Sequence, residues 1–493
     1  MTIFNYLIKF ILVVLIIFTP LAFGSFELWA FSLMELGILL IIILWMIQSA
    51  IFTLRSPGVA GAKDGRNLWP VQCGANFTGP PSAIVMVLLC VFLLLILFQM
   101  VPLPSGILKI LSPKTYALRS ALSPSMTQLP NDQLPMYPLS FVPFHTQIEF
   151  FKWVSLIGLF ILLLFWKPLG ESDKTRNQLI IAIMIVGMGE TLYGVYEFFS
   201  GHRHILHLDF SDSLSSVAGT FINRNQLAGY LSMVIPLSVG FLFSREAWQR
   251  GRPLGWRHQL TSLDGRTLLI GFSVVVMILG LLFSASRMGI VSLLLSFSLF
   301  SFLFRGREKR QKFSKTSILI LSLAILWATW IGLDAVISRF FTATEDFKTR
   351  WNIWVDTFRI FKDFPLFGSG LGTFLQIFPM YRSFHTRGLV THAENDFLQL
   401  ASETGVLGIG LLVALFFYLF TKAVLKIRSL SYGEPERYLG IGGLVGILAL
   451  MFHSIVERNI QMPANAFLYI ILWAIVLRIS PGGVNKPSNL KNH

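Results

Sequence analysis

The chain contains a series of apolar runs of about 20 residues, the length that a helix needs to cross the hydrocarbon core of a bilayer. Polar residues are correspondingly scarce: 13% of the 493 residues are charged, against about 25% in soluble domains. Backbone groups in lipid have no water to bind, so such runs must be helical. These features exclude a disordered chain, a nucleic-acid-binding module and an ordinary cytosolic enzyme. They predict an all-α polytopic membrane protein.

The apolar runs predict about twelve transmembrane helices. We expect them at residues 3–23, 28–52, 82–102, 148–166, 177–200, 226–244, 267–283, 287–305, 316–335, 398–420, 438–456 and 464–480. Basic residues accumulate in cytoplasmic loops and set the orientation of such a protein. Here they concentrate in three loops that are separated by even numbers of spans: 245–266, 305–315 and 421–437. All three loops, and with them both termini, are therefore expected in the cytoplasm.

The largest loop on the opposite side covers residues 336–397. It carries apolar residues at helical spacing: Trp351, Trp354, Val355, Phe358 and Phe361. This pattern predicts an amphipathic helix, which either lies flat on the outer leaflet, because Trp favours the interface, or packs on neighbouring helices. We divide the chain into N-terminal helices (1–200), central helices (201–335), this loop domain (336–397), and C-terminal helices with a short tail (398–493).

Two arginines on the non-cytoplasmic side are candidates for binding an anion. Arg224 stands where a loop enters the sixth predicted span, and Arg287 stands in the tight turn between the seventh and eighth spans. Two guanidinium groups there can hold a diphosphate by paired hydrogen bonds. The alternative for each is an arginine that only reaches the membrane interface.

A third polar group, Thr391-His-Ala-Glu-Asn-Asp396, directly precedes the tenth predicted span. It brings an imidazole (His392) and two carboxylates (Glu394 and Asp396) to the start of a helix. A general base must be a group of this kind within hydrogen-bond reach of the attacking hydroxyl. The competing interpretation is helix capping and salt bridging. Within the fifth span, Glu190 is expected either to pair with an arginine or to line a cavity.

Motifs for cofactor-dependent or hydrolytic chemistry are missing from the sequence. There is no GxSxG elbow, no HExxH, no Walker loop and no metal-binding cysteine pair. The glycines at 368, 370 and 372 follow Pro365 and predict a turn, with phosphate binding as the weaker alternative. We therefore expect no metal and no nucleotide cofactor.

Five segments together resemble the O-antigen ligase/polymerase superfamily. They are Gly219-Thr-Phe-Ile-Asn-Arg-Asn-Gln, Ser284-Ala-Ser-Arg-Met-Gly, Arg350-Trp-Asn-Ile-Trp, Pro365-Leu-Phe-Gly-Ser-Gly-Leu-Gly-Thr-Phe and His392-Ala-Glu-Asn-Asp-Phe-Leu-Gln-Leu-Ala-Ser-Glu-Thr-Gly. The resemblance is densest over 219–405, and it rests on the order and spacing of the motifs rather than on any one of them.

The resemblance implies a GT-C-like glycosyltransferase of the bacterial inner membrane that needs no metal. Such enzymes take a glycan from undecaprenyl diphosphate at the periplasmic face and transfer it to lipid A–core or to another glycan acceptor. By the same resemblance, Arg224 and Arg287 match the arginines that face the diphosphate, with Arg350 as a third candidate. His392 is the preferred counterpart of the family's histidine, and Glu394 is the alternative. Supporting roles fall to the polar neighbours in these motifs: Asn223, Asn225, Ser286, Asn395 and Glu403.

Two other functions compete with the ligase. One is a polymerase of the same superfamily, which extends lipid-linked repeat units to O-antigen or exopolysaccharide. The other is a transporter for lipid-linked glycans, which would bind the diphosphate without chemistry. Transporters tend to show inverted repeats and polar groups near the midplane. No repeat is evident here, and the key polar groups gather on one side.

Overall fold

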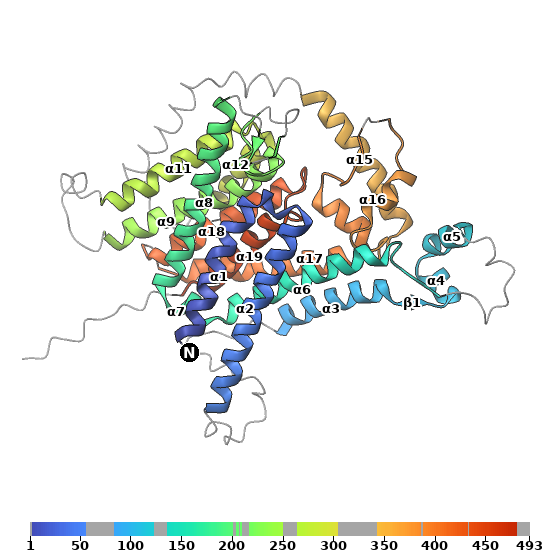
Figure 1. Ribbon diagram of the computed structural model, residues 1–493, viewed down its shortest axis with the longest axis horizontal. Helices are drawn as coiled ribbons and strands as arrows, with labels where there is room; N and C mark the ends of the chain where they lie inside the picture. The colour runs from blue at the N-terminus through green and yellow to red at the C-terminus, as the bar shows by residue number, and fades with distance from the viewer. Residues whose placement is uncertain are drawn as a thin grey trace, which may run out of the picture. The chain divides into compact units, whose positions relative to one another are not determined.

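The computed structural model describes residues 2–55, 83–122, 136–200, 204–206, 208–209, 216–249, 264–303, 343–385, 388–431 and 433–480. The described residues are predominantly α-helical (Figure 1). The chain forms two compact units. The first unit comprises 1–165, 334–419 and 451–467, and the second comprises 166–333, 420–450 and 468–493.

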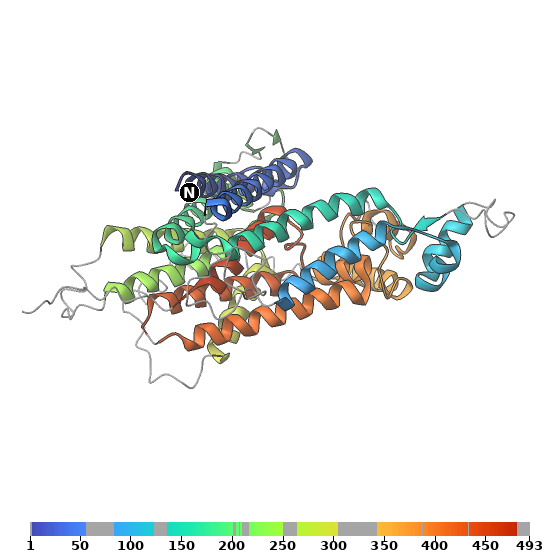
Figure 2. The ribbon, with the colours of Figure 1, turned by 90° about the horizontal axis from the view of Figure 1, so that it is seen from below.

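The first unit is built on long apolar helices with short elements at their ends. In chain order these are α1 (Thr2–Leu21), η1 (Phe23–Ser25), α2 (Leu28–Arg55), α3 (Ala83–Met100), β1 (Pro102–Leu103), α4 (Ser105–Leu111), α5 (Pro113–Leu122), β2 (Tyr137–Pro138), α6 (Pro143–Phe165), α15 (Ala343–Asp363), α16 (Phe374–Ile377), η5 (Phe378–Met380) and the first part of α17 (Asp396–Ser429). Helices α3 and α6 run side by side (Figure 2). Strands β1 and β2 pair antiparallel.

The second unit is a bundle in which α11 packs on both α8 and α9. Its elements are α7 (Lys167–Glu171), α8 (Asp173–Ser200), β3 (His204–Ile205), β4 (Leu208–Asp209), α9 (Arg224–Gln249), α11 (Gly265–Phe283), α12 (Arg287–Leu303), and most of α18 (Pro435–His453) and α19 (Pro463–Arg478). Helices α9 and α18 approach closely, since a Cβ on Gly240 would stand 2.6 Å from the carbonyl oxygen of Tyr438. Small residues at such contacts are typical of membrane helices.

The helices confirm an all-α polytopic membrane protein. Among the described residues, nine helices are long and apolar enough to cross a membrane, and Arg287–Leu299 and Pro463–Arg478 form two shorter apolar helices. Eleven of the twelve predicted spans coincide with these helices. The remaining one, at 316–335, lies outside the described residues.

One predicted span is interrupted. Helix α17 contains the whole stretch predicted at 398–420, but its backbone leaves the helical conformation at Gly405, where φ is 65° and ψ is −172°. The loop that follows Pro365 occupies this break. Val406 donates its N–H to the Pro365 carbonyl at 2.8 Å, and Ser369 and Gly370 donate theirs to the carbonyls of Ser402 and Glu403, each at 3.0 Å. Backbone groups freed by the break are thus satisfied within the protein, as a membrane-depth break requires.

The predicted amphipathic helix is α15, and it has two apolar faces. Ile353 and Ile360 are buried against α16 and η5. On the other face, Trp351 and Phe358 are 54% and 46% exposed. The helix therefore packs on its neighbours through residues outside the predicted stripe, while part of that stripe stays exposed. The prediction of a position at the membrane interface therefore still applies to the exposed face of α15.

Candidate active site

Arg224 and Arg287 each occupy the first position of a helix in the second unit. Arg224 begins α9, where Asn223 precedes it and accepts the Asn225 N–H through its side-chain oxygen at 2.8 Å. Arg287 begins α12, where the Ser286 hydroxyl accepts the Gly289 N–H at 3.3 Å. Asn223 and Ser286 are therefore the N-cap residues of the two helices. The N-terminus of a helix presents free N–H groups and a partial positive charge, both of which favour anions.

The two capped turns belong to one local structure. The Val217 N–H, from the loop before α9, donates to the carbonyl of Phe283 at the end of α11 at 3.2 Å. Helix α12 packs on α9. There, a Cβ on Gly289 would lie 2.8 Å from the Cβ of Ala228, one turn into α9. The structure therefore brings together the helix starts that carry the two predicted arginines.

A buried carboxylate holds the loop that carries Arg224. Glu190, 1% exposed in α8, accepts the Thr220 N–H at 2.8 Å and the Thr220 hydroxyl at 2.8 Å. We expected Glu190 either to pair with an arginine or to line a cavity, and in the described part of the chain it binds Thr220 instead. The Arg224 side chain donates instead to the hydroxyl of Ser216 at 3.4 Å. Glu190 thus acts on Arg224 only through the position of the loop.

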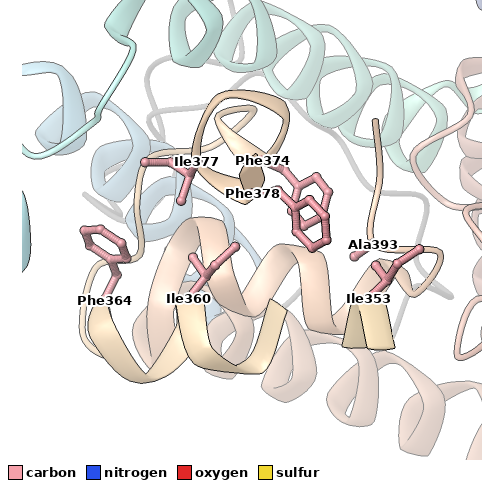
Figure 3. Close-up of a cluster of buried hydrophobic side chains, with 7 residues drawn as sticks. All are labelled: Ile353, Ile360, Phe364, Phe374, Ile377, Phe378 and Ala393. Carbon is pink, nitrogen blue, oxygen red and sulfur yellow. The ribbon is translucent and has the colours of Figure 1, made fainter. Parts of the chain in front are cut away.

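The segment around His392 lies in the first unit and is anchored by its middle residue. Ala393 is fully buried in an apolar cluster beside Ile353, near the stacked rings of Phe374 and Phe378 (Figure 3). The Trp354 indole donates to the Glu394 carbonyl at 3.3 Å. His392 and Glu394 directly flank this buried alanine in the chain.

The backbone at the start of α17 is shaped by two polar residues. Glu394 has a φ of 51°, a conformation that is strained for a residue with a side chain and that clusters at functional sites. Asn395, predicted as a supporting residue, caps α17 by accepting the Leu398 N–H at 2.9 Å. Its role in the described structure is therefore to end the strained turn and to begin the helix.

Arg458, in the connection between α18 and α19, contacts His392. An Nη1–H of Arg458 donates to the imidazole Nε2, which must then be unprotonated, so the ring proton is on Nδ1. Burial, together with the positive charges of Arg458 and Lys152, lowers the pKa of His392 to about 2. His392 is therefore a neutral ring whose basic nitrogen is already in use. This geometry favours Glu394 over His392 as a proton acceptor.

Arg350 and Glu394 both contact the carboxyl group of Glu457. Arg350 forms an ion pair with Glu457 at 2.5 Å and donates to the Val456 carbonyl at 2.5 Å. The carboxyls of Glu394 and Glu457 are within hydrogen-bonding reach of each other. Burial raises the pKa of Glu457, Glu394 adds to this shift and Arg350 opposes it, and the resulting pKa is about 8. The structure thus adds Glu457 and Arg458 to the residues predicted from sequence.

Asp396 joins these residues to α17. Its carboxylate, 5% exposed, accepts the N–H groups of Asn459 and Ile460 at 2.8 and 2.7 Å. The capping interpretation of this segment applies to Asn395, whereas Asp396 fixes the segment that carries Glu457 and Arg458. A signal for these two was present in the sequence, because both are charged and stand at the end of an apolar span.

Glu403 supports the loop in the break of α17. It is 2% exposed, and its carboxylate accepts the Phe374 N–H at the start of α16 at 3.1 Å. The glycine N–H groups of that loop are also engaged: Gly370 donates to the Glu403 carbonyl, and Gly368 donates to that of Phe364 at 3.1 Å. These bonds favour the turn over the phosphate-binding interpretation.

The predicted site residues thus form two groups. Arg224, Arg287, Asn223, Asn225 and Ser286 lie together in the second unit, whereas Arg350, His392, Glu394, Asn395 and Glu403 lie in the first. Within the part of the chain that is described, no group of three or more His, Cys, Asp or Glu side chains has an arrangement that could hold a metal ion.

Comparison with known families supports the resemblance seen in the sequence. Residues 272–413, less than a third of the chain, match the family described as O-antigen ligase. The matched segment carries Arg287, Arg350, His392 and Glu394, whereas Arg224 precedes it. None of the curated proteins searched matches the chain. The family match supports the O-antigen ligase/polymerase superfamily, and with it a glycosyltransferase-type membrane enzyme that uses lipid-linked glycans in general.

Proposed function

We propose that this protein transfers a glycan from undecaprenyl diphosphate to an acceptor hydroxyl at the periplasmic face of the bacterial inner membrane, as an O-antigen ligase does. The observation that carries the proposal is the pair of capped helix starts, α9 and α12, each with an arginine at its first position and packed together through Ala228 and Gly289. Two helix N-termini and two guanidinium groups are suited to an anion with several charged oxygens.

Arg224 and Arg287 act on the leaving group in this proposal. The bond between the anomeric carbon and the phosphate oxygen breaks, and its electron pair leaves with the diphosphate. The arginines stabilise that developing charge. The acceptor oxygen attacks the anomeric carbon from the opposite face, which inverts the configuration in one step. The acceptor proton passes to a carboxylate, for which we propose Glu394, since the Nε2 of His392 already accepts from Arg458.

The assay for this function supplies undecaprenyl-diphosphate-linked glycan to the purified protein in detergent, with EDTA and without nucleotide. Glycan on added lipid A–core together with released undecaprenyl diphosphate supports the ligase. Longer lipid-linked chains, formed from donor alone, support the polymerase, which shares the same donor site. Donor binding without turnover on either acceptor contradicts both and favours a transporter.

Orientation is tested separately. We propose that both termini are cytoplasmic and that both groups of site residues face the periplasm. Single cysteines introduced at Ser431, between α17 and α18, and at Leu389, before α17, report this arrangement. A membrane-impermeant thiol reagent applied to intact spheroplasts is expected to label the second and not the first. Labelling only at Ser431 contradicts the proposed orientation.

A further inference from the structure

Glu457 is a buried carboxyl group that no family motif in the sequence includes. It lies between α18 and α19, and its side chain meets Arg350 of α15 and Glu394 of the segment before α17. Glu457 is 4% exposed, whereas Glu394 is partly exposed. The more exposed member of the pair is therefore the one that a substrate can reach.

Two carboxyl groups in hydrogen-bonding contact cannot both be ionised without strong repulsion, and such pairs titrate as a unit. A hydrogen bond between them needs one proton. Removing Glu457 from water adds to the cost of its charge. The contact and the burial therefore both favour one retained proton in the pair.

The charges around the pair also indicate that it holds one proton. Arg350 and Arg458 carry one positive charge each, Asp396 carries one negative charge, and a pair with one proton carries another. The cluster is then neutral. His453, at the end of α18, also faces Arg350, and the neutral ring of His392 adds no charge. Glu149 and Lys152 of α6 form an ion pair with each other, and Glu403 interacts with Arg458 only through space.

We propose that Glu457 and Glu394 share one proton, and that Glu457 thereby positions Glu394 to receive the acceptor proton during glycan transfer. As the acceptor oxygen bonds to the anomeric carbon, its proton moves to the carboxylate of Glu394, and the pair then holds two protons. One proton returns to solvent after the product leaves. Glu457 is a positioning residue, because it acts through Glu394. The inference deepens the proposed function and rests on it.

The shared proton has a consequence for the pH dependence of transfer. In a pair without protons, the two negative charges repel each other and Glu394 is no longer held in place, whereas a pair with one proton carries a single charge that Arg350 balances. Since the pKa of Glu457 is raised to about 8, the pair keeps its proton at neutral pH and loses it above that value. Transfer is therefore expected to slow as the pH rises through about 8.

Proton sharing is measured without any enzymatic assay. Infrared spectra of the purified protein are recorded across the titration, and the spectrum of Glu457→Gln is subtracted from that of the wild type. We expect a protonated carboxyl band that disappears near pH 8. In Glu394→Gln, the band of Glu457 is expected to disappear at lower pH, because the negative partner is gone. Glu394 is partly exposed, so this variant tests the pairing even if Glu457→Gln does not fold.

Glu436→Gln is the matched control. Glu436 is also buried and paired with an arginine, Arg176, at 2.7 Å, but it lies in the second unit. Its substitution is expected to leave the Glu457 band and the pH profile of transfer unchanged. A Glu457 band that titrates at the same pH in the wild type and in Glu394→Gln overturns the shared proton.

Activity tests the positioning role. Glu457→Gln is expected to lower kcat by at least about tenfold, to leave the donor KM within about threefold, and to abolish the decline near pH 8. An unchanged kcat and pH profile contradicts the positioning role even where the infrared result stands. If no variant or wild type transfers glycan, the proposed function fails, while the infrared titration still decides whether the proton is shared.

Discussion

Replacing Arg287 by Ala removes a guanidinium from the start of α12 while the helix start itself remains. Asn223, Ser286 and the first N–H groups of both helices are unchanged by this substitution, so the variant isolates the side chain. In the proposed site, Arg287 makes two charge-assisted hydrogen bonds to the diphosphate, each contributing about 1.5–3 kcal/mol. Their sum of about 3–6 kcal/mol corresponds to a fall of about 10²- to 10⁴-fold in kcat/KM.

The measurement is the release of undecaprenyl diphosphate by purified protein in detergent, with the monodisperse fraction followed by size-exclusion chromatography. Arg266→Ala is the matched control, because Arg266 also stands in the first turn of a helix, α11, where it is exposed. The control is expected to keep wild-type transfer. Arg287→Lys keeps the charge but loses the paired geometry, so its loss is expected to be intermediate.

The reasoning about Arg287 is refuted by one outcome. If Arg287→Ala is monodisperse and transfers glycan at the wild-type rate, the start of α12 does not bind the diphosphate. An equal loss in Arg266→Ala instead shows that the assay reports general damage to the second unit.

Three further predictions address the loop, the base and the anchor of Arg224. Gly368→Ala is expected to destabilise the protein by about 2–5 kcal/mol, because φ is 73° and the new Cβ would stand 2.1 Å from the Glu403 carbonyl carbon. Thermal unfolding in detergent measures this loss. Gly388→Ala is the control, because a Cβ at Gly388 would meet no atom within 4 Å. His392→Gln is expected to lower transfer by less than about tenfold and Glu394→Gln by about a hundredfold or more, and the reverse order in the same release assay would make the imidazole the base. Glu190→Gln is expected to raise the donor KM more than it lowers kcat, because it loosens the loop that carries Arg224; a fall in kcat alone would contradict this.

Hydropathy was sufficient to locate the helices because each membrane span is a local property of the chain. Eleven of the expected spans lie on helices of the described structure. The break at Gly405 was not predicted, since an apolar run gives no sign of it. Its backbone groups are satisfied by the loop after Pro365, which lies about 40 residues earlier in the chain. Without this tertiary contact, the break in α17 would leave backbone groups without hydrogen-bond partners.

The candidate site, like the fold, could be predicted from the sequence only in part. Arg224 and Arg287 could be proposed from sequence, because a charged residue among apolar spans and directly after a capping residue is a local pattern. The choice between His392 and Glu394 could not be made there. It depends on Arg458, 66 positions from His392, and on Glu457, which lies more than 100 positions from Arg350. Burial and proximity set the protonation of His392 and Glu394. Both are determined only when the connection between α18 and α19 packs against α15 and the start of α17. That packing brings Arg458 to the imidazole and Glu457 to the Glu394 carboxyl.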